Sequence, residues 1–318
     1  MGTEPPVQSG PATSSRKRVA PLYVFFNGDT VLEEEALVSV RDRGFLYGDG
    51  IFETVRAYNG RPFLIEDHLQ RLASSAQVLE IPLHYSLEEL QIAAEKLLRL
   101  NKLSGSPPLR SAQGDGQQDA LIRVTLSRGE SQHYGLQPPE EAQPTLIIQT
   151  HPFHPHPEET YKQGIKLIIS AYRRSTTCPL ARHKTANFLT GIMARQEATR
   201  RGIQDALFLN TEGQVCEATV SNIFMVEFGV VITPSLQANI LPGITRKKVL
   251  EICRREGIGT SEELFGMERL FNADEVFLTN SLMEIMPVSH IEDRGIGKTV
   301  PGKITHRLME AYKGLTGQ

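Results

Sequence analysis

A proline-rich segment near the middle of the chain is the feature that most constrains the fold. Residues 151–157 read His-Pro-Phe-His-Pro-His-Pro, and proline interrupts both helices and strand pairing. The chain has 318 residues, which is long enough for two domains with separate cores. We therefore expect a linker at 151–158 between a smaller N-terminal domain, 22–150, and a larger C-terminal domain, 159–318.

Composition excludes several classes of protein. Residues 1–21 are rich in Pro, Gly, Ser and Thr and contain no apolar segment, which favours a disordered tail over a secretory signal. No apolar run is long enough to span a bilayer. The net charge of −3 gives no support for a nucleic-acid or membrane partner. Cys178, Cys216 and Cys253 form no Cys-x-x-Cys pair, which is typical of reduced thiols in a cytoplasmic protein.

Apolar spacing in the first half predicts a sheet covered by helices. Alternating or short apolar runs bounded by turn residues predict strands, and apolar residues three and four apart predict helices. The polar segment 104–119 predicts a flexible loop. The expected strands are 22–26, 36–40, 51–58, 120–126 and 145–149, and the expected helices are 66–79 and 87–100.

The second half alternates strands with helices. One helix is expected at 185–201 and ends at Gly202, with Phe188, Leu189, Ile192 and Met193 on one face. A second helix is expected at 245–255. The expected strands are 166–170, 206–210, a strand carrying Glu217, 230–233, and a last strand at 275–279.

Lys184 and Glu217 are the residues best suited to chemistry. Lys184 precedes a helix beside Arg182 and His183, where neighbouring positive charge and partial burial lower the pKa of an amine. A neutral amine is what attacks an aldehyde. Glu217 is expected in a buried strand, where a carboxylate needs a donor or a positive charge. A core arginine and a protonated ring nitrogen both meet that need.

Five separated segments resemble the class IV aminotransferases, which are fold-type IV pyridoxal phosphate enzymes. That family includes branched-chain aminotransferases, D-amino acid aminotransferases and aminodeoxychorismate lyase. The resemblance runs from Tyr23 to Tyr312 apart from the loop 104–119. The segments are Asp42-Arg-Gly-Phe-Leu-Tyr-Gly-Asp-Gly-Ile-Phe-Glu-Thr54, His68-Leu-Gln-Arg-Leu72, Lys184-Thr-Ala-Asn-Phe-Leu189, Glu217-Ala-Thr-Val-Ser-Asn-Ile-Phe224 and Gly243-Ile-Thr-Arg246.

The resemblance implies an α/β (α+β) fold. A smaller N-terminal α/β domain would sit beside a larger C-terminal domain containing a pseudo-barrel sheet. The active site would lie between the two domains, near the interface of a homodimer.

The resemblance also implies a role for each site residue. Lys184 would hold pyridoxal 5′-phosphate covalently, and Glu217 would face the pyridine nitrogen. The residues expected at the cofactor phosphate are Arg71, Gly243, Ile244, Thr245 and Ser281. The residues expected at the substrate are Phe52, Glu53, Arg123 and Asn280, with Arg128 as a competitor of Arg123.

The substrate is less constrained than the cofactor. Glu53 and residues 295–305 look like the amino acid aminotransferases, and a branched-chain-like substrate is the first interpretation. Residues 279–288 look more like aminodeoxychorismate lyase. Residues 131–135 lack the Arg-x-His carboxylate trap of the D-amino acid enzymes, which makes that specificity less favoured. A binding protein that keeps the fold without activity is the remaining alternative.

Three other patterns carry no function. Residues 295–299 end like a phosphate-binding loop, but Glu292 stands at the place of its first glycine. His151, His154 and His156 lack the spacing of metal ligands, so no metal is expected. Ser221 is not in a Gly-x-Ser-x-Gly segment, which gives a hydrolase no nucleophile.

Overall fold

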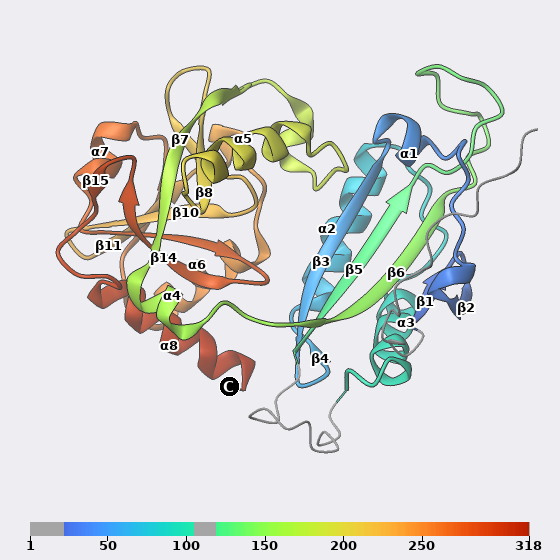
Figure 1. Ribbon diagram of the computed structural model, residues 1–318, viewed down its shortest axis with the longest axis horizontal. Coiled ribbons are helices and arrows are strands. Elements are labelled where there is room, and N and C mark those ends of the chain that lie inside the picture. The colour runs from blue at the N-terminus through green and yellow to red at the C-terminus, as the bar shows by residue number, and fades with distance from the viewer. Residues whose placement is uncertain (1–21, 105–118, 318) are drawn as a thin grey trace, which may run out of the picture.

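The computed structural model describes residues 22–104 and 119–317. The expected tail, 1–21, and most of the expected loop, 104–119, lie outside the described residues. The described chain forms two lobes, each built on its own sheet (Figure 1).

The N-terminal lobe is a six-stranded sheet in the order β2-β1-β6-β5-β3-β4, and every neighbouring pair is antiparallel. Two helices contact it, and Leu69 and Leu72 of α2 join Leu90 and Leu97 of α3 in the buried core. The Ser86 hydroxyl and the Glu89 carboxylate cap the start of α3 reciprocally, and α3 spans the predicted residues. The elements are β1 (Tyr23–Phe26), β2 (Asp29–Leu32), η1 (Glu33–Glu35), α1 (Arg43–Tyr47), β3 (Gly50–Tyr58), β4 (Arg61–Pro62), α2 (Ile65–Val78), α3 (Leu87–Leu100), β5 (Asp119–Ser127) and β6 (Thr145–Phe153).

The C-terminal lobe contains a nine-stranded sheet that closes on itself. Six strands follow one another as β10-β13-β14-β7-β8-β9, and β9 then pairs back to β10 through Glu217 and Asn222. This ring confirms the predicted pseudo-barrel. The strands are β7 (Ile165–Arg174), β8 (Asp205–Asn210), β9 (Val215–Ala218), β10 (Asn222–Glu227), β11 (Val230–Pro234), β12 (Thr260–Glu263), β13 (Glu275–Asn280), β14 (Glu284–Ile291) and β15 (Arg294–Gly295).

Helices surround this second sheet. Helix α5 packs on β7 and β8, whereas α6 and α8 pack on each other and on β13. The helices are α4 (Glu158–Gln163), η2 (Pro179–Arg182), α5 (Leu189–Arg200), η3 (Leu236–Ala238), α6 (Ile244–Arg255), α7 (Met267–Phe271) and α8 (Lys303–Thr316). No helix among the described residues is long and apolar enough to cross a membrane.

Several element boundaries differ from the prediction. The helix expected at 185–201 begins at Leu189, because the backbone of 184–186 bonds to β3 instead of to a helical turn. Residues 36–40 form no strand, and Leu37 and Val40 are exposed. The strand expected to be the last is followed by β14 and β15.

The apolar side chains that share one face of α5 are not its buried residues. Leu189, Ile192 and Met193 are exposed, whereas Ala194 and Ala198 are fully buried. Small side chains on the inner face let the helix lie close against β7 and β8. Apolar spacing alone did not show that the larger side chains face outward.

The first part of the expected linker belongs to β6. His151, Pro152 and Phe153 pair with β5, whereas β1 pairs only with Ile147 and Ile148 on the other side of β6. Pro152 therefore lies where β6 has a strand on one side only, a place that tolerates a missing N–H group.

The burial of α3 gives a paired test of the core. Leu97→Ala should lower the free energy of unfolding by about 2–5 kcal/mol, because Leu97 is fully buried and truncation leaves a cavity. Leu100→Ala on the same helix should cost much less, because Leu100 is 41% exposed. Urea unfolding of both variants measures the difference, and equal losses would place the core on another face of α3.

Candidate active site

The two lobes meet where the segment carrying Lys184 runs along β3. The Phe52 N–H donates to the Lys184 carbonyl, and the Ala186 N–H donates to the Gly50 carbonyl, both at 2.9 Å. Asn187 Nδ2 donates to the Gly48 carbonyl at 3.2 Å. These bonds hold the Lys184 segment of the second lobe against β3 of the first lobe.

The Lys184 amine lies among aromatic rings. Its Nζ atom is 4.4 Å from the centre of the Phe52 ring and 6.0 Å from that of Phe188. Burial lowers the pKa of Lys184 to about 8, and the charges of Arg71 and Arg123 act in the same direction, whereas Glu53 opposes them. A substantial fraction of this amine is therefore neutral near physiological pH.

The buried Glu53 carboxylate holds two neighbouring side chains, Arg71 and His68, in place. Both Glu53 oxygens accept bonds from Arg71, from Nε at 2.7 Å and from an outer nitrogen at 2.8 Å. His68 Nδ1 contacts Glu53 Oε2 at 2.7 Å. Burial alone would raise the pKa of Glu53, but the bond with His68 and the charge of Arg71 outweigh burial and hold it at about 2. Glu53 is therefore ionised and fixes the orientation of Arg71.

The N-terminus of α6 faces the same region. Arg71 donates to the Pro242 carbonyl at 2.8 Å, which places its guanidinium beside Gly243. Ile244 and Thr245 are buried in the first turn, and no described side chain caps this end. A Cβ atom on Gly243 would lie 1.9 Å from the Asn222 Oδ1 atom, so this close approach requires glycine.

Glu217 lies on β9 at the closure of the barrel. Its Oε2 atom accepts from the Leu241 N–H at 3.2 Å and from Asn222 Nδ2 at 3.3 Å. An Arg174 nitrogen lies 3.4 Å from Oε1. Burial raises the pKa of Glu217, and Arg174 and the Leu241 N–H counteract this rise. Arg174 is thus the expected core arginine, and the positive charge of Lys184 also lowers the pKa of Glu217.

The turn between β13 and β14 supplies the remaining residues. The Ser281 hydroxyl contacts His68 Nε2 at 3.2 Å, which brings it next to the group formed by Glu53 and Arg71. Asn280 stabilises the turn itself, because its Oδ1 atom accepts from the N–H groups of Leu282 and Met283 at 2.9 and 2.8 Å.

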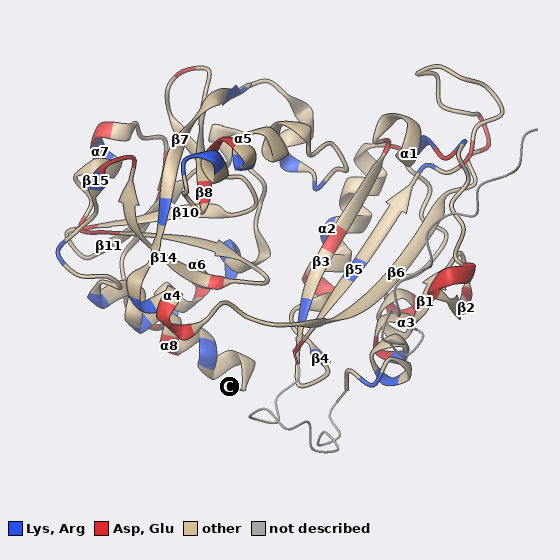
Figure 2. Ribbon diagram, in the orientation of Figure 1, with Lys and Arg blue, Asp and Glu red and all other residues tan. Residues whose placement is uncertain are grey.

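The two competing arginines have different environments. Strands β3 and β5 of the smaller sheet carry charged residues (Figure 2). Arg123 of β5 lies over the Phe52 ring, with its Cζ atom 3.3 Å from the ring centre. Burial lowers the pKa of Arg123 to about 10. The structure places Arg123, and not Arg128, beside Lys184 and Phe52.

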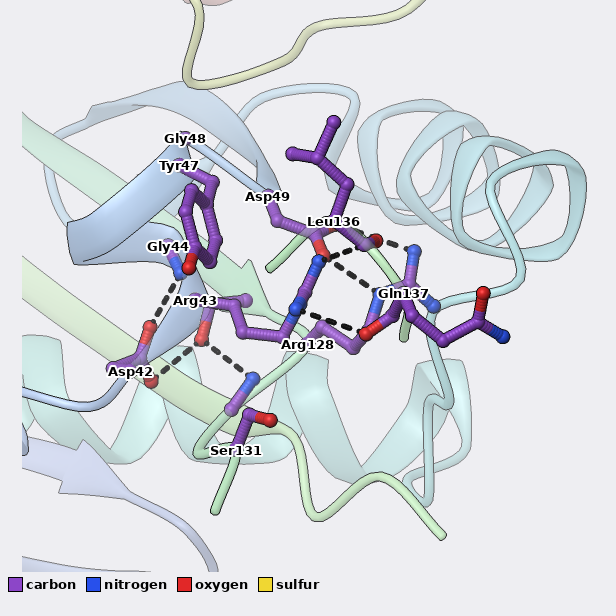
Figure 3. Close-up of polar contacts among 12 residues, drawn as sticks. Asp42, Arg43, Gly44, Tyr47, Gly48, Asp49, Arg128, Ser131, Leu136 and Gln137 are labelled. Atoms are coloured by element: carbon purple, nitrogen blue, oxygen red, sulfur yellow. Dashed lines mark hydrogen bonds and ion pairs between the residues drawn. The ribbon is translucent and has the colours of Figure 1, made fainter. Parts of the chain in front are cut away.

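Arg128 has a structural environment. Arg43 and Arg128 converge on Asp49 (Figure 3), each with Nε at 2.8 Å from Oδ2. Arg128 also donates to the Leu79 carbonyl, and Arg43 donates to the carbonyls of Gly135, Leu136 and Gln137. These contacts fix the loop ahead of β3.

Sequence reasoning missed four residues that complete the site. His68 and Asn222 lie inside the segments that carried the family resemblance, so closer attention to those segments could have found them. Arg174 ends β7 with no local signal, and Tyr312, which packs against the Phe63 ring of the first lobe, lies in a helix that was not predicted.

The donor set fits pyridoxal phosphate. A buried, uncapped helix N-terminus beside a guanidinium and two hydroxyls suits a phosphate group. A partly neutral lysine suits an aldehyde, and a buried carboxylate suits a protonated ring nitrogen.

Comparisons with known proteins agree with this geometry. The family model for amino-transferase class IV matches residues 50–291. The branched-chain-amino-acid aminotransferase of Escherichia coli K12 is 31% identical over 304 residues, which cover 93% of this chain and 94% of that protein. A provisionally named branched-chain-amino-acid aminotransferase of Methanocaldococcus jannaschii is 36% identical over 295 residues, which cover 92% and 96%.

A solved structure leads to the same result. The crystal structure of the Escherichia coli branched-chain amino acid aminotransferase matches with a TM-score of 0.85 at 30% identity, covering 93% of this chain and 95% of that chain. With the family match over residues 50–291, this likeness shows that the chain belongs to the class IV aminotransferases.

Proposed function

We propose that this chain is a pyridoxal phosphate-dependent aminotransferase that moves an amino group between a branched-chain-like amino acid and a 2-oxo acid. The observation that carries the proposal is the position of Lys184, which β3 holds next to Phe52 and Arg123 with a lowered pKa. A related crystal structure, of a branched-chain amino acid aminotransferase complexed with N-(5′-phosphopyridoxyl)-L-glutamate, matches with a TM-score of 0.82 at 28% identity, covering 94% of this chain and 96% of that chain.

Each residue has a defined task in this proposal. When bound, pyridoxal phosphate supplies the electron sink for the bond broken at the substrate Cα atom. Lys184 would hold the cofactor aldehyde, and its amine would later take a proton from that Cα atom and deliver it to the C4′ atom of the cofactor. Glu217 stabilises a proton on the ring nitrogen.

Two further groups bind the ends of the cofactor and the substrate. Arg71, Ser281 and the N–H groups at 243–245 bind the phosphate. Arg123 binds the substrate carboxylate, and Phe52 forms an apolar wall of the pocket. Because Glu53 fixes Arg71, it acts on the phosphate side through that arginine.

Aminodeoxychorismate lyase is the second candidate. Residues 279–288 resemble that enzyme, and the lyase of Bacillus subtilis is 32% identical over 290 residues, covering 91% of this chain and 93% of that protein. The same cofactor would then serve an elimination that releases pyruvate.

We also propose a cytoplasmic homodimer. Large apolar side chains are exposed near α1 and on α5, a pattern typical of surfaces that another chain covers. The three cysteines are free, in keeping with a reducing compartment. A monomeric mass in solution would contradict the dimer.

A half-reaction tests the function. The purified protein loaded with pyridoxal phosphate is mixed with single L- and D-amino acids in the absence of any oxo acid. We expect branched-chain L-amino acids to convert the visible absorbance band to that of the pyridoxamine form. A spectrum that no amino acid changes, together with pyruvate release from aminodeoxychorismate, would support the lyase instead.

The lowered pKa of Lys184 predicts a pH dependence. The rate at which the apoprotein captures pyridoxal phosphate should rise with pH through a midpoint near 8, because the neutral amine is the reacting form. The absorbance of the covalent product measures this rate, and Lys184→Ala should give no such product. A midpoint near 10 would mean that the amine is not perturbed.

The two arginines can be separated by kinetics. Arg123→Met should raise the KM of the amino acid by about tenfold or more, the loss of one charge-assisted contact, with a smaller effect on kcat. Arg128→Met is the matched control and should lower the Tm, because Arg128 holds Asp49 and Leu79. An unchanged KM in Arg123→Met would remove Arg123 from the substrate site.

A further inference from the structure

We propose that Arg56 and Glu284 are positioning residues that hold the turn carrying Ser281, the hydroxyl residue expected at the cofactor phosphate. The inference rests on the proposed function, because it concerns how tightly the phosphate is bound. Neither residue is expected to touch the cofactor. Both lie in a buried group of side chains that joins the two lobes behind the phosphate region.

Arg56 connects three segments through one guanidinium. Its Nε atom donates to Asp119 Oδ2 at 3.0 Å, which ties it to β5. One outer nitrogen donates to Glu284 Oε1 at 2.8 Å and to the Leu282 carbonyl at 2.9 Å. The Arg56 side chain is only 3% exposed, so these bonds form away from water. The guanidinium therefore anchors the turn 281–283 of the second lobe to the sheet of the first.

The anchored turn carries Ser281. The Leu282 carbonyl held by Arg56 belongs to the residue that follows Ser281 directly. Glu284 ends the turn with a left-handed backbone, φ 59°, a conformation that costs energy for a residue with a side chain unless surrounding contacts fix it. Arg56 supplies two of those contacts, and the Tyr161 hydroxyl adds a bond to the Met283 carbonyl at 3.2 Å. The position of the Ser281 hydroxyl thus depends on contacts made outside the turn.

A second contact holds Glu284 itself. The Tyr58 hydroxyl donates to Glu284 Oε1 at 2.9 Å, and Tyr58 is buried. Two side chains of β3, Arg56 and Tyr58, therefore hold the carboxylate that follows the turn carrying Ser281.

The charges make this group sensitive to substitution. One guanidinium faces two carboxylates, Asp119 and Glu284, in a region without solvent. Loss of one partner leaves a buried charge poorly compensated, and the backbone has to move to relieve it. Any such change would lower the stability of the protein, so a stability measurement does not separate a positioning role from a purely structural one. A comparison of ligands with and without a phosphate group separates the two roles.

The experiment compares pyridoxal phosphate with pyridoxal, which lacks the phosphate. Dissociation constants of both are measured by absorbance titration of the full-length apoprotein for the wild type and for Arg56→Lys. Lysine keeps the positive charge but cannot reach Asp119, Glu284 and the Leu282 carbonyl together. Glu284→Gln is the second variant, because it keeps the shape of the side chain and removes its charge.

The chain offers a matched control at the other end of β14. Glu292 also has a left-handed backbone, φ 53°. It pairs with Arg201 and accepts from the Ile169 N–H at 2.6 Å. Glu292→Gln therefore removes a similar charge from a similar backbone position, away from the turn 281–283.

We expect Arg56→Lys to weaken pyridoxal phosphate binding about tenfold and Glu284→Gln about threefold, with pyridoxal binding within about twofold of the wild type in both. Glu292→Gln should change neither constant. Equal changes for the two ligands, including no change in either, would overturn the positioning role while leaving the proposed function intact. A wild-type protein that captures neither ligand would overturn the proposed function and this inference with it.

Discussion

The site depends on two backbone hydrogen bonds between β3 and the segment 184–186. Through them, residues 184–186 of the second lobe pair with β3 of the first sheet at Gly50 and Phe52. Backbone bonds fix position more strictly than side-chain contacts, because they involve no rotatable side-chain bonds. The position of the Lys184 amine relative to Arg71 and Arg123 follows from this pairing. The same bonds explain why α5 starts four residues later than apolar spacing predicts.

The charged groups around Lys184 are balanced in pairs. Glu53 neutralises Arg71, and Arg174 lies against Glu217. Each of these four charges thus has a compensating neighbour before any ligand arrives, which limits the cost of burying it. Arg123 differs, since its guanidinium lies on an aromatic ring and its pKa is depressed by burial. It is the cation of this group with the most to gain from an incoming carboxylate.

Much of the fold could be predicted from the sequence, and the reasons are local. Helix α3 has regular apolar spacing and a capping pair at Ser86 and Glu89, so its bounds were correct. The exposed face of α5 was not predictable, because apolar spacing marks one face of a helix without showing whether the core covers it. Helix α8 and strand β14 were missed, and β14 contains Pro287, a residue that is uncommon inside a sheet. Each site motif could be recognised from its own short stretch of sequence. The contact of Arg174 with Glu217 joins residues 43 positions apart and has no local sequence signature.

The Lys184 segment has a consequence for how the protein folds. Lys184 comes from the chain after β7, whereas its neighbours Phe52 and Arg123 come from the first sheet, more than sixty residues earlier. Bringing such distant residues together closes long loops, which costs entropy. The lowered pKa of Lys184 depends on this long-range contact, because burial and the charges of first-lobe residues cause it. The reactivity of this side chain toward an aldehyde therefore reports whether the two lobes are docked.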